Sequence, residues 1–308
     1  MGFKKNLKES LIHTLYEADR LFHSDQDIAG LSTSIDELDK MTSGFKNGEL
    51  IIVAGRPGMG KSAFAMSCAL HSAIIKRKAI AWFGLEMPIE QLTMRMLSST
   101  SKIDIDRIIN GQLLEGEWGK LNKAINELEK SHIYIDDLNT SHVNQVSGKA
   151  REINQIALRE LIKDPKYSGS HQQGVGLIVV DYLQLINEDS KTSSRSAKAV
   201  KILSTLKSLA VELNVPIMVL SQLNRKLDYR SDKRPILADL DSAEIEMYGD
   251  LILALYREEY YDPDTPYRGY ADISVLKQRN GPLGTVVTIF NGSYLTFENF
   301  KNEETNGY

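Results

Sequence analysis

The stretch GRPGMGKS at residues 55–62 constrains this sequence most, because it fits the pattern G-x-x-x-x-G-K-S. It follows the apolar run ELIIVA (49–54) and precedes an apolar-periodic stretch that starts at Ala63. A loop between a strand and a helix can cradle phosphates where Gly58 and Gly60 carry no side chain, and the helix adds its positive end. A structural glycine turn is the alternative. The flanking strand and helix patterns favour a nucleoside triphosphate site instead.

The residues of this loop predict a phosphate site with a metal ion. Lys61 would neutralise the β- and γ-phosphates, and the Ser62 hydroxyl would bind Mg²⁺. A second magnesium ligand should end another core strand, and the run GLIVVD (176–181) ends on Asp181, which could alternatively cap the next loop. ATP and Mg²⁺ are therefore the expected cofactors, and the expected nucleotide-binding residues are Gly55, Arg56, Pro57, Gly58, Met59, Gly60, Lys61, Ser62 and Ala63.

Short apolar runs alternate with helical patterns from residue 31 onward. Continuous apolar strands separated by helices indicate a parallel sheet covered on both faces. The last runs differ, because Asn291-Gly292 between TVVTIF and SYLTF predicts an antiparallel hairpin with an Asn-Gly turn. We expect an α/β fold with a P-loop NTPase core and a C-terminal hairpin, with helices including 90–98 and 198–214 and strands at 49–54, 79–84, 132–136, 176–181, 216–221 and 251–256.

The N-terminal segment is expected to lie outside this core. Leu7, Leu11 and Leu15 recur at helical spacing, so residues 5–22 predict an amphipathic helix before the polar linker HSDQDIAG. Its apolar face either folds back on its own domain or docks on a neighbouring subunit. The expected organisation is a helix and linker over 1–30, a motor domain over 31–300 and an unstructured tail over 301–308.

Composition limits the classes of partner. No run reaches the roughly 18 apolar residues that a membrane span needs, and the N-terminus has no apolar signal core. A single cysteine, Cys68, excludes an internal disulfide framework and a cysteine metal cluster, so the cytoplasm is the expected location. The net charge of −4 lacks the basic footprint of a protein that coats nucleic acid. It still allows a ring that binds DNA through a few loops.

Polar residues at further strand ends complete a RecA-type order along the chain. Glu86 follows the run AIAWFG and is the candidate catalytic base, or simply an acid at a helix N-terminus. Gln222 could sense the γ-phosphate or cap a turn. Motors of this type work at subunit interfaces, where a basic residue of the neighbour reaches the γ-phosphate. Lys277 and Arg279 are the candidates because they share one face of an extended segment, although a solvated strand end would look the same.

Several motifs together carry a specific resemblance. The chain resembles the C-terminal motor domain of the DnaB family of replicative DNA helicases over roughly 31–300, through GRPGMGKS, LEMP, DYLQL, SQLNR and KQRNGP in family order. The resemblance implies a RecA-like core and an ATP-hydrolysing homo-oligomer, a six-membered ring. It implies Glu86 as catalytic base, with Lys277 and Arg279 acting on the neighbour's site.

The resemblance also implies single-stranded DNA in the ring channel. One strand would be pulled through in the 5'–3' direction and the other excluded, with a helicase loader or primase as further partners and no membrane partner. The channel loops would be 187–197 and 229–247. Phosphate contacts by cations release counterions, so the expected DNA-binding residues are the cations of these loops, Arg195, Arg230, Lys233 and Arg234. The alternative is that RSDKR (230–234) is an outer solvated turn.

Two departures from the family leave an alternative open. The family usually has a separate N-terminal domain, where this sequence has only the expected helix at 5–22, so either a truncated or a naturally short form is expected and primase binding is open. The family's DNA loop reads close to DLRESGAIEQDAD, whereas this chain has DLDSAEIEMYGD (239–250), with Asp241 where positive charge is expected. The alternative is a helicase-like ATPase without unwinding activity that joins or regulates a helicase ring. A RecA-like recombinase would need strand-exchange loops that the sequence does not show.

Overall fold

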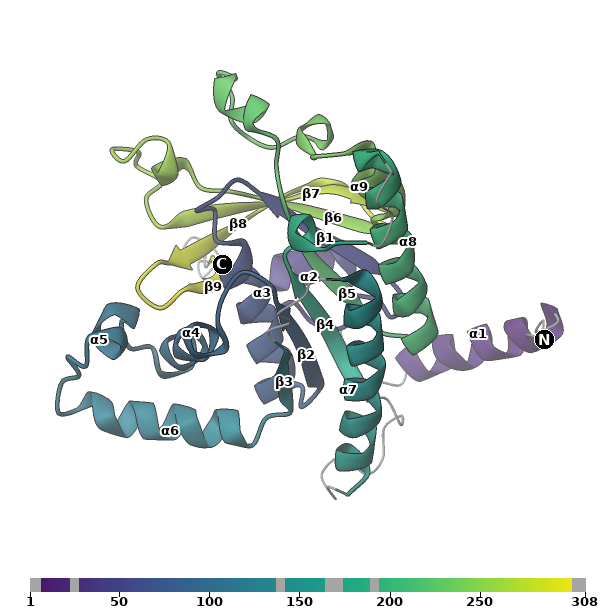
Figure 1. The fold of residues 1–308 in the computed structure, drawn as a ribbon, viewed down its shortest axis with the longest axis horizontal. Helices are drawn as coiled ribbons and strands as arrows, with labels where there is room; N and C mark the ends of the chain where they lie inside the picture. Colours follow the sequence, from purple (N-terminus) through teal and green to yellow (C-terminus); the bar gives the residue numbers. More distant parts are fainter. Residues whose placement is uncertain (1–6, 23–27, 137–141, 164–173, 189–193, 301–308) are drawn as a thin grey trace, which may run out of the picture.

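A single twisted sheet organises the molecule (Figure 1). The computed structural model describes residues 7–22, 28–136, 142–163, 174–188 and 194–300. The described strands are ordered β3-β2-β4-β5-β1-β6-β7-β8-β9. Their bounds are β1 (Leu50–Gly55), β2 (Ala79–Gly84), β3 (Ile133–Asp136), β4 (Val175–Asp181), β5 (Ile217–Gln222), β6 (Leu251–Tyr256), β7 (Tyr270–Gln278), β8 (Gly284–Asn291) and β9 (Thr296–Asn299).

The six strands predicted from apolar runs all form, each within a residue of its expected bounds, and all pair in parallel. Four of them, β1, β2, β4 and β6, are buried along their whole length, as expected for strands covered on both faces. Alternate residues feed two separate cores: Ile51 and Val53 enter one, Leu50 and Ile52 the other. Because the strands are parallel, their carboxyl ends meet at one edge of the sheet.

Helices cover both faces of this sheet (Figure 1). One core includes side chains of α2 (Asp36–Thr42), α3 (Lys61–Leu70) and α4 (Ile89–Ser101). The other includes side chains of α7 (Val143–Lys163), α8 (Arg195–Leu213) and α9 (Ala243–Tyr248). The helix predicted over 90–98 lies within α4, and the one predicted over 198–214 corresponds to α8 and its C-cap Asn214. The helices that the apolar patterns do not predict are α2, α5 (Ile105–Ile109), α6 (Glu117–Glu129), α7 and α9.

The C-terminal strands pair antiparallel, which confirms the predicted hairpin. The predicted two-residue Asn-Gly turn is wrong, because Asn291 ends β8 and a four-residue turn over 292–295 leads to β9. The Asn291 side chain explains the longer turn: its Oδ1 accepts hydrogen bonds from the backbone N–H groups of Ser293 and Tyr294. Leu295 closes the turn in a left-handed conformation.

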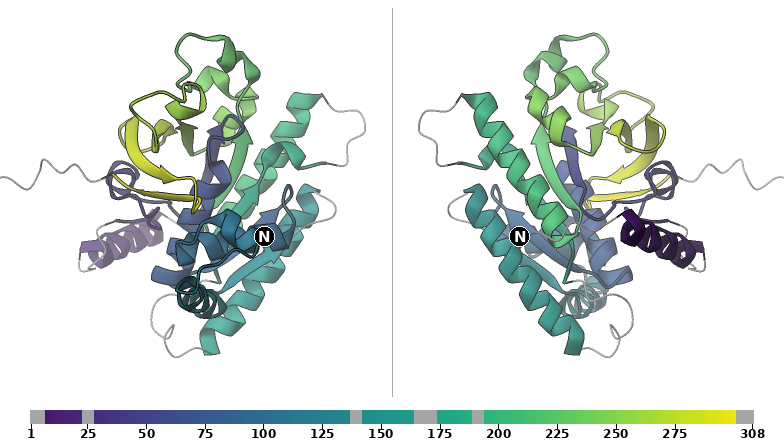
Figure 2. Two further views of the ribbon diagram at one scale, coloured as in Figure 1. Left: turned by 90° about the vertical axis from the view of Figure 1, so that its left-hand side faces the viewer. Right: turned by 90° about the vertical axis from the view of Figure 1, so that its right-hand side faces the viewer.

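Helix α1 (Leu7–Phe22) projects away from the sheet in all three views (Figures 1 and 2). The side chains of Leu7, Leu11 and Leu15 are exposed, so this helix does not fold back on its own domain here. The expected tail over 301–308 and part of the linker lie outside the described residues. No helix in the described part of the chain is both long and apolar enough to cross a membrane.

Candidate nucleotide site and strand-end loops

The glycine-rich loop connects β1 to α3, where the sequence predicts it. Gly58 and Gly60 have φ values of 81° and 89°, a region that side chains disfavour. A Cβ at Gly58 would lie 2.5 Å from the Tyr260 ring, so only glycine fits there. Met59 is buried in the core and anchors the loop, while the neighbouring Pro57 is exposed. The loop therefore exposes backbone in a shape that suits phosphate oxygens.

Lys61 lies at the start of α3 and folds back over the loop. Its Nζ donates hydrogen bonds to the carbonyl oxygens of Gly55, at 3.0 Å, and Arg56, at 3.2 Å. Burial lowers the pKa of Lys61 to about 8, although the carboxylates of Asp181 and Glu86 favour its charged form. The Lys61 ammonium thus lies in a partly desolvated position next to two acids, where the negative charge of a phosphate would stabilise its charged form.

Asp181 ends β4 beside the loop and is 2% exposed. The Ser62 hydroxyl donates a hydrogen bond to its carboxylate, yet burial raises its pKa to about 6. Its Oδ2 is buried without a hydrogen-bond partner among the described residues. A buried carboxylate oxygen of this kind fits a cation. Mg²⁺ suits the site, because it takes one or two protein oxygens together with phosphates and water.

Glu86 follows β2, the neighbour of β4 in the sheet. The backbone N–H of Leu85 donates to the Asp181 carbonyl at 2.8 Å, which ties the two strand ends together. The Glu86 side chain is exposed and its charge acts on both Lys61 and Asp181. An exposed carboxylate next to a phosphate site can take a proton from water.

Gln222 ends β5 directly beside the start of the loop, where it pairs with Gly55. Its side chain is hydrogen-bonded to the Tyr182 hydroxyl. The side-chain amide of Gln184 fixes the Gln222 backbone. Its Oε1 accepts a hydrogen bond from the Gln222 N–H at 3.2 Å, and its Nε2 donates to the Gln222 carbonyl at 3.3 Å. The structure thus places the four predicted residues Lys61, Asp181, Glu86 and Gln222 at one edge of the sheet.

Arg56 has a role in the structure that the loop pattern does not reveal. Its guanidinium makes a two-point contact with Asp228, with Nη2–Oδ2 at 2.7 Å and Nε–Oδ1 at 3.2 Å, and a bond to the Leu223 carbonyl. The Arg56 side chain is therefore committed to the segment after β5. Only its backbone remains to contact phosphate.

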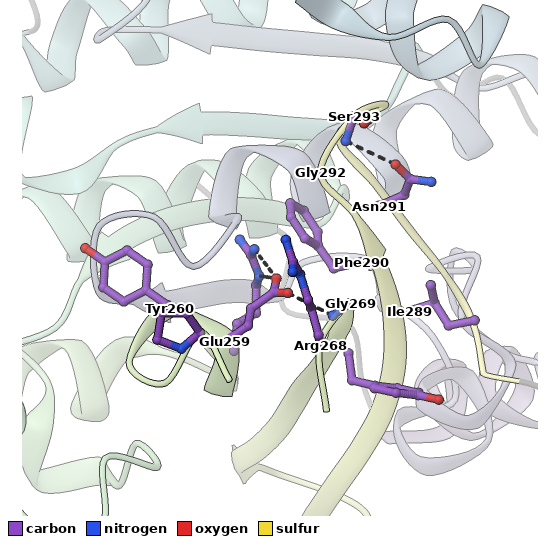
Figure 3. Close-up of a pocket in the computed structure, with 12 residues that line it drawn as sticks. Glu259, Tyr260, Arg268, Gly269, Ile289, Phe290, Asn291, Gly292 and Ser293 are labelled. Carbon is purple, nitrogen blue, oxygen red and sulfur yellow. Dashed lines mark hydrogen bonds and ion pairs between the residues drawn. The ribbon is translucent and has the colours of Figure 1, made fainter. Parts of the chain in front are cut away.

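A cavity of about 910 Å³ adjoins the loop on the side of β6 and β8 (Figure 3). Arg257 forms one wall: it donates to the Gly58 carbonyl at 2.9 Å and stacks over the Phe290 ring at 3.9 Å from the centroid. Tyr260 forms another and touches the loop at Gly58. No motif in the sequence predicts Arg257 or Tyr260 at this site. The one signal was the run LYREEYYD (255–262), which is rich in aromatic and charged residues.

The four cations expected to hold DNA are all engaged within the chain. Arg195 pairs with Asp241, Arg230 with the buried Asp239 at 2.9 Å, and Arg234 lies over the Tyr256 ring beside Glu258 and Asp272. Lys233 donates to the Asp228 carbonyl at 2.8 Å. Part of the first predicted loop, 189–193, lies outside the described residues.

The expected trans-acting residues Lys277 and Arg279 lie at the other edge of the sheet. The end of β7 pairs with Leu251 at the start of β6, and Leu251 is level with Ile51 at the start of β1. The loop follows the opposite end of β1, a strand of roughly 17 Å. The structure therefore does not bring Arg279 together with Lys61 of the same chain.

Residues 30–299 match the family described as the DnaB-like helicase C terminal domain. The chain belongs to this family. The resemblance and the fold class predicted from the sequence are thereby confirmed.

Curated relatives and solved structures agree with this assignment. The replicative DNA helicase DnaB of Buchnera aphidicola subsp. Schizaphis graminum is 42% identical, over 96% of this chain and 61% of that protein. The DnaB of Geobacillus stearothermophilus is 39% identical, over 97% and 63%. The chain thus spans about three fifths of their length. A solved ATPase domain (TM-score 0.86, 31% identity, 97% and 100% covered) and a DnaB-like replicative helicase that interacts with primase (TM-score 0.82, 31% identity, 97% and 68%) share its fold.

Proposed function

We propose that this chain is the motor of an ATP-driven DNA helicase of the DnaB type. The observation that carries the proposal is the set Lys61, Ser62, Asp181 and Glu86, which gathers around one glycine-rich loop. Family membership favours replicative helicase activity, since the curated relatives are replicative DNA helicases. ATP is the expected substrate and Mg²⁺ its partner ion.

Each of these residues would have a separate role in ATP hydrolysis. The loop N–H groups and Lys61 would hold the phosphates and neutralise charge that develops on the γ-phosphate. Ser62 and Asp181 would hold Mg²⁺, which supplies further charge neutralisation when bound. Glu86 would orient the attacking water and take its proton. Gln222, fixed by Gln184, would respond to whether the γ-phosphate is present.

The cavity beside the loop would accept the base and ribose of the nucleotide. It has the size of a small-molecule pocket and contacts the phosphate loop through Arg257 and Tyr260. Flat cationic and aromatic side chains offer stacking surfaces for a base. This arrangement supports nucleotide binding without strict selectivity for adenine.

Placement of Arg279 at the far edge of the sheet supports action on a neighbouring subunit, because a ring interface can bring two opposite edges together. The exposed apolar residues Leu7, Leu11 and Leu15 of α1 support docking of this helix on a second copy of the chain. We therefore propose a homo-oligomeric ring, six-membered as the family resemblance implies. Translocation on single-stranded DNA with 5'–3' polarity, and contacts with a loader or primase, are further expectations.

One observation favours a second function. The acidic residue Asp241 holds Arg195 in an ion pair at the expected DNA loops. A chain with its DNA-facing cations neutralised could hydrolyse ATP without unwinding, as a member or regulator of a helicase ring.

One experiment separates these functions. We would measure ATP hydrolysis with and without single-stranded DNA, unwinding of a forked duplex, and mass by sedimentation on the same preparation, with Lys61→Ala as control. DNA-stimulated hydrolysis with unwinding by a ring supports the helicase. Hydrolysis without unwinding supports the second function. Hydrolysis that persists in the Lys61→Ala variant would overturn the site.

A further inference from the structure

Within the part of the chain that the structure describes, the side chain of Arg279 is anchored at one nitrogen only. Its Nε pairs with Oδ1 of Asp250 at 2.7 Å, and Asp250 is 1% exposed while the Arg279 side chain is 66% exposed. A guanidinium has five N–H donors, of which the four on the two Nη atoms lie beyond this bond. The anchored end therefore lies at the protein surface and the charged end extends outward, as a group that serves a neighbour requires.

The carboxylate that holds Arg279 is itself fixed from two other sides. Oδ2 of Asp250 accepts a bond from the Leu50 N–H at 2.8 Å, at the start of β1. It also accepts one from Lys207 Nζ of α8 at 2.6 Å, and this ammonium bonds the Gly48 carbonyl too. A buried carboxylate with all these donors has one orientation. Asp250 thus provides a rigid support for Arg279.

A second anchor holds the same segment. Lys277 Nζ donates to the Glu246 carbonyl and, at 2.8 Å, to the Gly249 carbonyl, where α9 ends. Two of its three donors are thereby occupied, and its charge lies at the negative end of α9. Since Lys277 is committed to α9, Arg279 is the better candidate of the two for reaching another subunit.

We propose that Asp250 is the positioning residue of Arg279, which it aims at the γ-phosphate bound by the neighbouring subunit. The inference rests on the proposed function and deepens it, because it adds a residue to which the sequence patterns assign no role. A preorganised charge costs no reorganisation when the transition state forms, so its value depends on its support. Loss of Asp250 should lower turnover of the assembled ring without weakening nucleotide binding.

The test compares both partners of the same carboxylate. Asp250→Asn removes the charge that holds Arg279 and keeps the size of the side chain. We expect kcat to fall about 10- to 100-fold, the scale of a misplaced catalytic group, with KM for ATP changed less than about twofold. Lys207→Met is the matched control, because it removes the other ion pair while the Leu50 N–H and the Arg279 pair still hold the carboxylate. It should leave kcat within about twofold of wild type.

Two further variants distinguish positioning from damage. In the Arg279→Ala background, Asp250→Asn should change kcat less than about twofold, because its effect passes through the missing arginine. If Asp250→Asn alone does not fold, the double variant with Lys207→Met removes the stranded ammonium as well and should show the same loss of kcat. Thermal melting and nucleotide binding report folding for every variant.

The outcomes separate this inference from the proposed function. Loss of turnover in both Arg279→Ala and Asp250→Asn, but not in Lys207→Met, supports the inference. Normal turnover in Asp250→Asn while Arg279→Ala is inactive overturns it and leaves the helicase motor standing. Equal losses in Asp250→Asn and Lys207→Met also overturn it. Normal turnover in Arg279→Ala would sink both the inference and the shared-interface site.

Discussion

The two charged regions at the carboxyl edge of the sheet differ in how their charges are satisfied. Around the glycine-rich loop, Asp181 keeps a buried oxygen without a partner among the described residues, and Lys61 is bound to carbonyl groups of the loop. In the segments after β4 and β5, Arg195 and Arg230 are each paired with an acid. The first region is built to receive a ligand. In the second region, the charges of Arg195 and Arg230 are already neutralised by acids of the same chain.

The difference shows that a cation in a loop is not automatically available to DNA. Arg230 is bound at two oxygens of the buried Asp239, so its release would leave a buried carboxylate without its cation. The Arg195 side chain is 77% exposed, and its pair with Asp241 costs little to break. Of these two, Arg195 is the cation that the proposed DNA partner would recruit. Substitutions in the two regions test this contrast, from the largest expected effect to the smallest.

Glu86→Gln should lower kcat for ATP by roughly 10²- to 10⁴-fold, because it removes the proposed base and keeps the shape of the side chain. Nucleotide affinity should remain, since Glu86 does not hold the phosphates. Glu90→Gln, an exposed acid in the first turn of α4, is the matched control and should turn over normally. Steady-state hydrolysis with a fluorescent-nucleotide titration checks both, and an unchanged kcat would move the base elsewhere.

Asp181→Asn should stabilise the ligand-free protein above pH 6 while abolishing the proposed Mg²⁺-dependent nucleotide binding. A pKa raised from 3.8 to about 6 means that the folded state disfavours the ionised carboxylate, a penalty of about 3 kcal/mol. The unfolded chain releases the proton near pH 4 and the folded chain near pH 6, so wild-type stability falls with rising pH across this window. The advantage of the variant should therefore vanish below about pH 4. Urea unfolding at pH 4 and pH 7.5 measures it, and an equal difference at both would contradict the assignment.

Arg230→Met should destabilise the fold by about 1–3 kcal/mol, since Asp239 loses its charged partner in a buried position. Affinity of the folded protein for single-stranded DNA should change little. Lys226→Met, at an exposed cation of the same segment, should leave stability unchanged. Urea unfolding measures the change in stability, and fluorescence anisotropy of a labelled oligonucleotide measures the change in DNA affinity. A stable Arg230→Met protein that has lost DNA affinity would mean that Arg230 serves DNA binding and not the fold.

Asp241→Asn should tighten binding of single-stranded DNA by no more than about fivefold, because exposed ion pairs are worth about 0.2–1 kcal/mol. The gain comes from release of Arg195, so it should disappear in an Arg195→Ala background. It should also shrink as salt rises. Glu246→Gln is the control, because it removes one negative charge from nearby α9 without freeing Arg195. If both acid substitutions tighten binding equally, net charge rather than the pair sets affinity.

Local patterns were enough to predict much of this protein. The six parallel strands follow from short apolar runs, and those buried on both faces are apolar at successive positions because neither face contacts water. The glycine-rich loop follows from Gly58 and Gly60, whose backbone conformation few other residues adopt. The gathering of Glu86 and Asp181 follows from strand-end position, because parallel strands bring their carboxyl ends to one edge.

Long helices with few apolar positions were harder to predict. The helix α7 runs over 21 residues, yet its buried side chains are spaced between many polar ones, so the apolar pattern is diluted. The turn after Asn291 likewise depends on where β8 ends. That end is set by pairing with neighbouring strands, which the Asn-Gly pair alone does not reveal.

The sequence by itself determined which residues carry charge and which edge of the sheet receives the phosphates. Only the tertiary structure decided which charges are satisfied internally. Asp250 lies next to Arg279 because β6 and β7 are antiparallel neighbours, although both strands and their connection separate the two residues in the chain. Arg195 meets Asp241 because α8 packs beside the segment that leads into α9. Such pairs form across large sequence separations, where local patterns carry no information and the packing of whole elements sets the distance.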